Sequence, residues 1–453
     1  MPTATSRILN ELNELKRRFD GTAAQEMESL LDVVARRVLK DVESLVHLHE
    51  ALMFVVAYPQ SPKVRAKAES ALRAFSQRVT VLRDAEIDLS TLEHPDVSGI
   101  AGTSVTDNFS YETMAWLARM YPRELEFYWE WLEDENRLGE VWQRFMPLLE
   151  EDSLVEANVP YRKWLDAARG KDASVPWLLH LFRKLPVLEK LKAELYNSQK
   201  LYVTWTPSYH ATRTGLRLNS VLPGRVFYHR GPLIQRRDVN FKNEVQQSPA
   251  PVTKLTRTNS VAAINLAREA STVRYRELYG FTHADPDQVF AVGLGRGVVL
   301  LTFALPPEKR LPLRAYHAAM IFKNGVPVGY FEGLSLFERM ESGFNLYYTF
   351  REGETAWLYA QTLNHYRHLL AVTTFSIDPY QVGHENEEGI ESGAFWFYWK
   401  LGFRSTDLEL NSLAEHEQQR INNNRRYRTS AAVLRKLARA SMVLGIAERS
   451  ISD

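Results

Sequence analysis

The sequence predicts an α+β protein in which a helical N-terminal region precedes a mixed α/β domain and a helical tail. Before about residue 200, apolar residues recur at helical spacing, as at Leu30, Leu31, Val34 and Val38. Later, short β-type runs such as VVLLTFAL and AVTTFSI alternate with helical segments. A length of 453 residues favours two or three domains. We therefore assign a helical domain to 1–200, which can divide into sub-bundles at 1–95 and 96–200, a second domain to 201–410 and a helical, basic extension to 411–453.

Composition and charge restrict the function classes. Hydrophobic residues make up 45% of the chain and charged residues 25%, as in soluble globular proteins. The net charge of +1 gives no overall attraction to nucleic acid or to an anionic membrane. The absence of cysteine excludes disulfides, thiolate metal sites and a cysteine nucleophile, and it fits a cytoplasmic location. The longest apolar run, at 51–58, is far shorter than the ~20 residues that span a bilayer, so we expect no membrane span.

The first half offers two patterns that resemble ligand sites. Four tryptophans lie between 111 and 145, and such an aromatic stripe is more typical of a core seam than of a ligand site. The sequence His47-Leu-His49-Glu50 resembles a zinc-binding helix, but Met53 stands where the second histidine would have to be. We therefore expect structural or solvated histidines here and no metal.

The second half contains strands, turns and three helical segments. Asn324-Gly325 between two strand-like runs predicts a tight hairpin, because both central residues of such a turn need positive φ. Gly293-Leu-Gly295-Arg-Gly297 also predicts a hairpin turn, since no helix follows to bind phosphate. Helices are expected at 260–279, 354–370 and 390–401. The run 418–439 has many arginines and no acidic residue; it is either a solvated helix face or a local patch for RNA or another anionic surface.

The order of elements in 314–403 is strand, Asn-Gly hairpin, strand, strand, glycine-containing turn, helix, strand and helix, ending in the sequence FYWKLGF. This order and this ending resemble the GNAT superfamily of N-acetyltransferases. The resemblance implies a mixed sheet in which two neighbouring parallel strands splay apart, with an acyl-CoA donor in the gap. The two strands would be 344–350 and 372–377.

The resemblance also implies a donor site at the start of the helix between these strands. Free backbone N–H groups there would receive pyrophosphate. The family turn has Arg or Gln, two residues, Gly, one residue, then Gly or Ala; here it reads Arg351-Glu352-Gly353-Glu354-Thr355-Ala356. Glu354 stands where a glycine is expected, so the thioester donor can be acyl-CoA, an acyl carrier protein or another donor such as an aminoacyl-tRNA. No tightly bound cofactor is implied. The implied binding residues are Tyr348, Thr349, Phe350, Arg351, Gly353, Thr355 and Ala356.

Tyr398 corresponds to the family tyrosine that protonates the departing thiolate. A phenol with a pKa near ~10 suits an acid but not a base at neutral pH, so another group must accept the proton of the amine. The candidates are Glu332, Glu391 and His384. The alternative for Tyr398 is a buried tyrosine with a purely structural role.

The implied reaction is acyl transfer to the amine of a small molecule, lipid or peptide. Arg268, Arg274 and Arg276 in the predicted helix 260–279 either bind an acidic substrate or face water. Beyond residue 403 the chain departs from the two-strand hairpin of the family and becomes polar and helical. The alternative function is a catalytically degenerate member that binds a partner or acts as a scaffold through its helical half.

Overall fold

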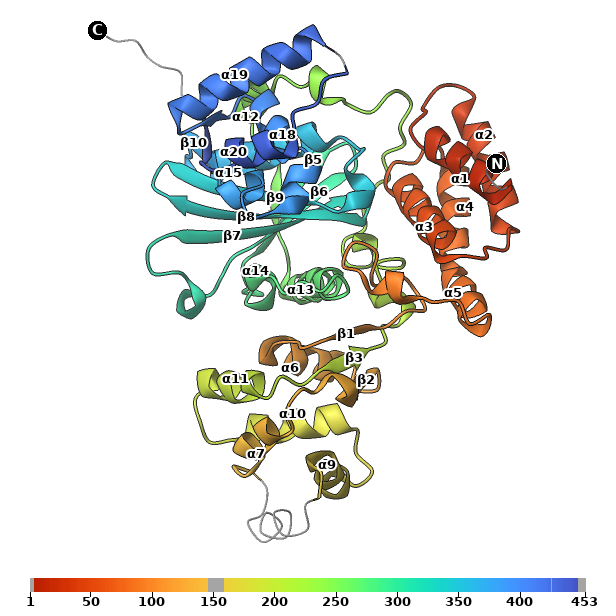
Figure 1. Ribbon diagram of the computed structural model, residues 1–453, viewed down its shortest axis with the longest axis vertical. Helices are drawn as coiled ribbons and strands as arrows, with labels where there is room; N and C mark the ends of the chain where they lie inside the picture. The colour runs from red at the N-terminus through yellow and green to blue at the C-terminus, as the bar shows by residue number, and fades with distance from the viewer. Residues whose placement is uncertain (1–3, 146–158, 425, 447–453) are drawn as a thin grey trace.

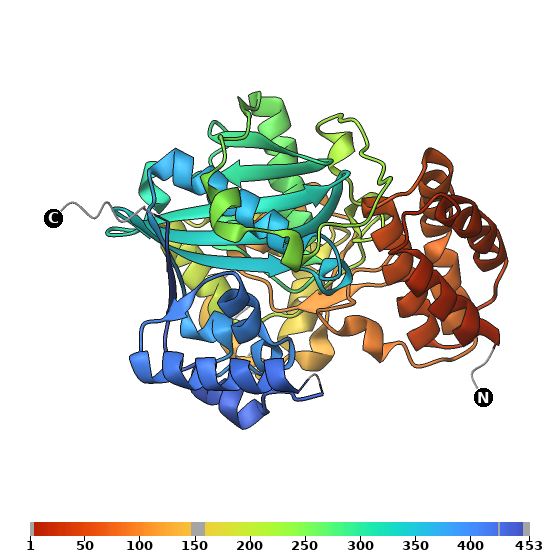
Figure 2. The ribbon, with the colours of Figure 1, turned by 90° about the horizontal axis from the view of Figure 1, so that it is seen from above.

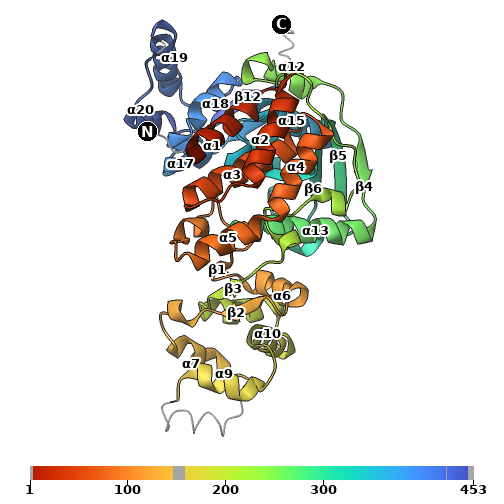
Figure 3. The same ribbon diagram turned by 90° about the vertical axis from the view of Figure 1, so that its right-hand side faces the viewer.

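A computed structural model describes residues 4–145, 159–424 and 426–446 of the chain (Figure 1). In this part, five N-terminal helices stand beside a domain with a nine-stranded sheet, and a smaller lobe projects away from both (Figures 1 and 3). The predicted α+β class, with a helical N-terminal region and a large, mostly antiparallel sheet, is therefore confirmed.

The N-terminal helices pack around α3. They are α1 (Ala4–Leu15), α2 (Ala23–Ala35), α3 (Val42–Ala57), α4 (Pro62–Arg73) and α5 (Phe75–Asp84). Asp41 caps α3 and Ser61 caps α4, each by accepting a hydrogen bond from a backbone N–H in the first turn. Every residue from 51 to 57 is buried, because α3 is covered by its neighbouring helices on one side and by the sheet domain on the other. Figure 2 shows this group of helices at one side of the large sheet.

The prediction for 96–200 was a helical bundle, but the small lobe contains a sheet as well as helices. Its helices are α6 (Tyr111–Met120), α7 (Asn136–Trp142), α9 (Tyr161–Arg169), α10 (Ser174–Lys184) and α11 (Glu189–Ser198). Three short antiparallel strands, β1 (Val105–Asp107), β2 (Leu125–Phe127) and β3 (Val203–Trp205), form a second sheet in the order β1-β3-β2. Strands of three residues are too short to show a two-residue period in the sequence. Trp116 and Trp142 lie in the core of this lobe as expected, whereas Trp131 is 46% exposed.

The nine strands of the large sheet run in the order β11-β12-β10-β9-β8-β7-β6-β5-β4. Their bounds are β4 (Val252–Lys254), β5 (Val289–Gly295), β6 (Val298–Phe303), β7 (Ala315–Lys323), β8 (Val326–Leu336), β9 (Arg339–Leu346), β10 (Thr374–Ile377), β11 (Arg404–Ser405) and β12 (Met442–Gly445). All neighbouring pairs are antiparallel except β9 and β10, which are parallel.

Helices cover both faces of this sheet (Figure 1). One face carries α13 (Arg257–Thr272) and α14 (Tyr279–Thr282), and the other carries α12 (Phe241–Gln246), α15 (Thr355–Leu370) and α18 (Ala394–Lys400). We call these the α13 face and the α15 face. Successive side chains of a strand point to opposite faces. In β8, Tyr330 accordingly packs in the core beside α13, while Phe331 stacks on Tyr366 of α15 with ring centroids 4.8 Å apart.

The parallel strands β9 and β10 pair over only part of their length. Thr374, Phe375 and Ser376 pair with Arg339, Met340 and Glu341, respectively. From residue 342 to 346, β9 pairs with β8 alone among the described strands. β10 ends at Ile377, one residue beyond the last of these pairs, whereas β9 continues to Leu346.

The predicted strand 344–350 is wrong in its second half. The strand ends at Leu346, and Tyr348–Phe350 forms a 3-10 turn, η7. In this turn the backbone N–H of Phe350 bonds the carbonyl of Tyr347 instead of a neighbouring strand. The predicted helix 354–370 is observed as α15.

The C-terminal region returns to the sheet, which corrects the prediction that it stays helical. After β11 come α19 (Leu408–Asn423) and α20 (Ala431–Leu437), and then β12 inserts between β10 and β11. The two strands after α18 therefore extend the sheet, with two helices inserted between them. Most of the basic run 418–439 forms the end of α19 and α20, and Arg425 lies outside the described residues. None of the helices in 4–145, 159–424 and 426–446 combines the length and the hydropathy that a bilayer span requires.

Candidate functional site

A cavity of about 670 Å³ lies beside the part of β9 that extends beyond its pairing with β10. Phe344, Leu346 and Tyr398 line it from the α15 face. Tyr330 lines it from the α13 face. Glu332 lies two residues beyond Tyr330 in β8 and therefore shares its face. The cavity is thus lined by residues from both faces of the sheet.

The N-terminus of α15 lies at the wall of this cavity. Thr355 and Ala356 line it, and no side chain caps the helix. The Thr355 hydroxyl donates a hydrogen bond of 2.9 Å to the carbonyl of Arg351, which closes the turn before the helix. An uncapped helix start presents free backbone N–H groups and a partial positive charge, so an anionic group is favoured here.

Glu354, which replaces the expected glycine, does not line the cavity. Its side chain is fully buried and accepts hydrogen bonds from Lys323 Nζ at 3.1 Å and from the guanidinium of Arg296. Burial alone would raise the pKa of this carboxyl, but Lys323 and Arg296 more than offset burial and hold the pKa below its ordinary value. The negative charge is therefore neutralised on the side of the turn away from the cavity.

The N-terminal helices support the same turn. A Cβ atom added at Gly353 would lie 2.4 Å from Tyr58 Oη, at the end of α3, so only glycine fits this close approach. Glu352 pairs with Lys16 Nζ at 3.0 Å and with Arg17 Nη1 at 3.3 Å. Arg351 lines the cavity and pairs with Glu388 of α17 (Glu387–Glu391). The turn is therefore held from both sides.

Only four of the seven predicted donor-binding residues line the cavity: Arg351, Gly353, Thr355 and Ala356. The other three lie in η7. Tyr348 is exposed, and Phe350 is buried in the core. Thr349 accepts a hydrogen bond of 3.4 Å from Arg213 Nη2.

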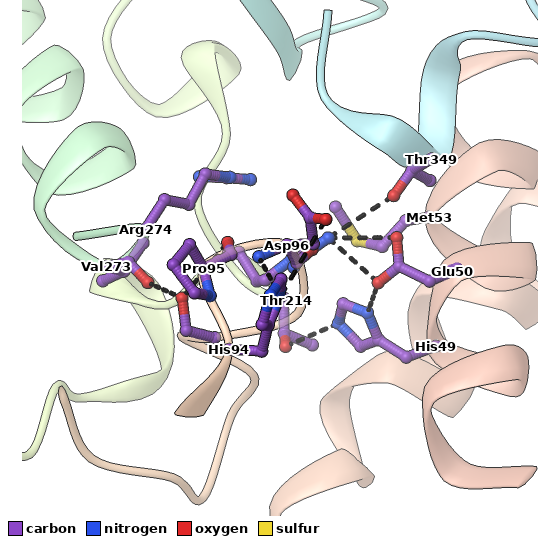
Figure 4. A network of polar contacts seen from close by, with 12 residues as sticks. His49, Glu50, Met53, His94, Pro95, Asp96, Thr214, Val273, Arg274 and Thr349 are labelled. Atoms are coloured by element: carbon purple, nitrogen blue, oxygen red, sulfur yellow. Dashed lines mark hydrogen bonds and ion pairs between the residues drawn. The ribbon is translucent and has the colours of Figure 1, made fainter. Parts of the chain in front are cut away.

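Arg213 belongs to a buried polar network that joins three parts of the molecule (Figure 4). Its guanidinium donates to Glu50 Oε1 of α3 at 2.9 Å and to the carbonyl of Asp96 at 2.6 Å. His49 bonds Glu50 at 2.8 Å and Thr214 at 2.9 Å, and burial lowers the pKa of its imidazole. His49 thus has a structural role, and within the described residues no group of three or more His, Asp or Glu side chains is placed to hold a metal.

Tyr398 lies at the inner end of the cavity. Its side chain is 4% exposed, and its hydroxyl makes no hydrogen bond to the part of the chain that the structure describes. The ring packs edge-on against Tyr359 and Phe403. Burial raises the pKa of the phenol above its ordinary value, so it stays protonated at neutral pH.

Of the three candidate bases, Glu332 alone lines the cavity. It is half-buried and accepts a hydrogen bond from the Tyr316 hydroxyl. Glu391 and His384 are exposed and do not line the cavity. The structure therefore brings Tyr398 and Glu332 to one space from opposite faces of the sheet.

The sequence reasoning missed several cavity residues. Among them are Tyr330 and Asn345, which face each other across β8 and β9. Strand alternation could have placed Tyr330 on the face of Glu332, but Asn345 requires the register between β8 and β9, which no local signal gives.

Comparison of the chain with protein-family models, with curated proteins and with solved structures found no match.

Proposed function

We propose that the protein is an acyltransferase that moves an acyl group from a thioester donor to an amine by direct attack. One observation carries the proposal: a single cavity beside the end of β9 is lined by an uncapped helix start, a buried phenol and a carboxylate, and these residues come from both faces of the sheet. The GNAT-like order of elements in 314–403 supports the same reaction.

The donor would lie on the α15 face. Its anionic part would bind at the N-terminus of α15, where Glu354 is turned away and therefore does not repel it. Its thioester would reach toward Tyr398 along the edge of β9 that leaves β10. The backbone groups of that edge are free of a partner strand, and an N–H among them would polarise the thioester carbonyl.

The amine would attack from the α13 face. Glu332 would take a proton from the amine, directly or through water, as the nitrogen bonds to the acyl carbon. The tetrahedral intermediate would then expel the thiolate, and Tyr398 would transfer its proton to the sulfur. The products are an amide and a free thiol. Binding both reactants in one cavity would supply the alignment that direct attack needs.

Calorimetric titration with acetyl-CoA, a long-chain acyl-CoA and an acylated carrier protein tests the donor site. We expect binding of at least one of them, and release of free thiol when an amine mixture of amino acids, polyamines and peptides is added. Absence of binding by all three would contradict the proposal. Binding without thiol release from any amine would instead support the degenerate, binding-only alternative.

A further inference from the structure

The large cavity has a narrow extension of about 40 Å³ on the α13 face. The two spaces share six lining residues: Arg276, Tyr330, Asn345, Leu346, Arg351 and Glu388. The extension adds Asp96 from the small-lobe side and Arg274 from the residues that follow α13. Tyr330 and Asn345 connect it to the proposed acceptor side of the site, and Tyr348 and Arg351 border it from the turn before α15.

Arg274 is a buried cation without a direct ion pair among the described residues, although the charge of Glu50 lies near enough to attract it. Its side chain is 4% exposed, and within the described chain it forms no ion pair with a carboxylate. One guanidinium nitrogen donates to the carbonyl of Ala270, and the group lies 3.9 Å from the ring centroid of Tyr347. Figure 4 shows Arg274 beside the Arg213 network but not joined to it by a polar contact. A buried charge without a partner is costly, so such a group is normally paired when its site is complete.

Arg276 is a second cation at the extension that forms no ion pair among the described residues. Arg351 is paired with Glu388, and the ion-pair contact of Asp96 is with His94 Nδ1 at 3.9 Å. Arg276 lines both spaces and pairs with no carboxylate among the described residues. Two arginines two residues apart thus offer several N–H donors to one small space, an arrangement suited to a carboxylate or a phosphate.

The position of these arginines assigns them to the acceptor. The donor's anionic part is expected at the start of α15, on the opposite face of the sheet. Arg276 lines the same cavity as Glu332, and Tyr330, on the α13 face, lines both the cavity and the extension. A molecule bound there by its anionic group would present its amine toward the carboxylate that accepts the proton.

We infer that the acceptor is an amine that also carries a carboxylate or phosphate group, and that Arg274 and Arg276 bind this group in the extension. The role of this amine as the acceptor rests on the proposed acyl transfer. The anion site itself stands on the arginines and the cavity alone.

Thiol release should be measured with matched amines: phenylalanine against phenylalaninamide for the carboxylate, and O-phosphoethanolamine against ethanolamine for the phosphate. We expect the wild-type protein to prefer the anionic member of one pair, and the preferred pair identifies the group. Arg276→Gln and Arg274→Gln should each lower kcat/KM for that anionic amine by about 10- to 100-fold, the worth of charge-assisted hydrogen bonds, and so reduce the preference over the neutral amine. Arg257→Gln, at the other end of α13 and paired with Asp287, is the matched control and should change neither.

A second measurement does not depend on catalysis. Inorganic phosphate is titrated into the protein in the presence of excess coenzyme A, which would occupy the donor site. Weaker phosphate binding in Arg276→Gln and in Arg274→Gln, but not in Arg257→Gln, supports the anion site even if no thiol is released, and in that case the proposed function alone fails. Equal rates with the anionic and neutral amines, or phosphate binding that neither variant weakens, would overturn the inference. Arg276 is exposed, so Arg276→Gln remains informative if Arg274→Gln does not fold.

Discussion

Replacement of Lys323 by methionine tests whether the buried ion pair at the start of α15 holds the donor loop. Lys323 and Glu354 are both fully buried, and the lysine donates to Glu354 Oε2 at 3.1 Å and to the carbonyl of Arg296 at 2.7 Å. Removing one member of a buried pair costs roughly 3–5 kcal/mol when the other charge is left alone. Here Arg296, whose side chain is 30% exposed, still pairs with Glu354, while the Arg296 carbonyl loses its donor. We therefore expect Lys323→Met to lower the free energy of unfolding by about 3 kcal/mol.

Urea denaturation measures this loss as a lower transition midpoint at an unchanged m-value. The double variant Lys323→Met/Glu354→Gln removes the uncompensated charge, so it should recover about half of the loss. Acetyl-CoA binding should weaken in the single variant and return in the double variant, because only a charged, released Glu354 repels phosphate. A loss below about 1 kcal/mol, or additive effects in the double variant, would refute the view that the pair holds this carboxylate away from the cavity.

Three further substitutions test other parts of the site. Tyr398→Phe removes one hydroxyl from the cavity wall and should reduce kcat about 10²- to 10⁴-fold. Donor affinity and thermal stability should stay unchanged. Unchanged thiol release would exclude Tyr398 as the acid. Gly353→Ala places a Cβ 2.4 Å from Tyr58 Oη and should weaken acetyl-CoA binding at least ~10-fold by calorimetry, whereas Gly224→Ala, which meets no atom within 4 Å, should not. Burial lowers the pKa of His365 to about 4 from 6.5, so between these values the unfolded chain binds more protons, and the stability that the neutral imidazole contributes is lost as the pH falls. In His365→Phe, the unfolding free energy should therefore fall less steeply between pH 6.5 and 4, by up to about 1.4 kcal/mol per pH unit. An unchanged slope would contradict a lowered pKa for His365.

Features fixed by local chemistry could be predicted from the sequence. Asn324 and Gly325 adopt positive φ in the turn between β7 and β8, as the hairpin prediction requires. Arg296 and Gly297 do the same between β5 and β6, which confirms a hairpin turn rather than a phosphate loop. In both cases the steric needs of two or three residues determine the conformation, so neighbours along the chain carry the whole signal.

Features fixed by distant contacts could not be predicted. The sequence suggested that Glu354 would disturb the donor loop, but its partners Lys323 and Arg296 lie 31 and 58 residues away in the chain. The strand β12 is four residues long and reaches β10 from 65 or more positions downstream. The aromatic run 344–350 has a high β propensity, yet Arg213 contacts Thr349 in a turn instead. Tertiary contacts decided each of these cases.

The same distant contacts suggest what the helical half does for the site. Lys16, Arg17 and Tyr58 of the N-terminal helices contact the turn before α15, and Glu50 of α3 holds the arginine that bonds η7. Local hydrogen bonds, such as that from the Gly353 N–H to the Phe350 carbonyl, close part of this turn, and contacts from outside hold the rest of its shape. In this chain, the N-terminal helices and the hairpin turns that carry Arg296 and Lys323 impose it together. The helical half is therefore part of the framework of the proposed donor site, and a change at its contacts with residues 349–354 should alter donor affinity before it alters the proposed acceptor side.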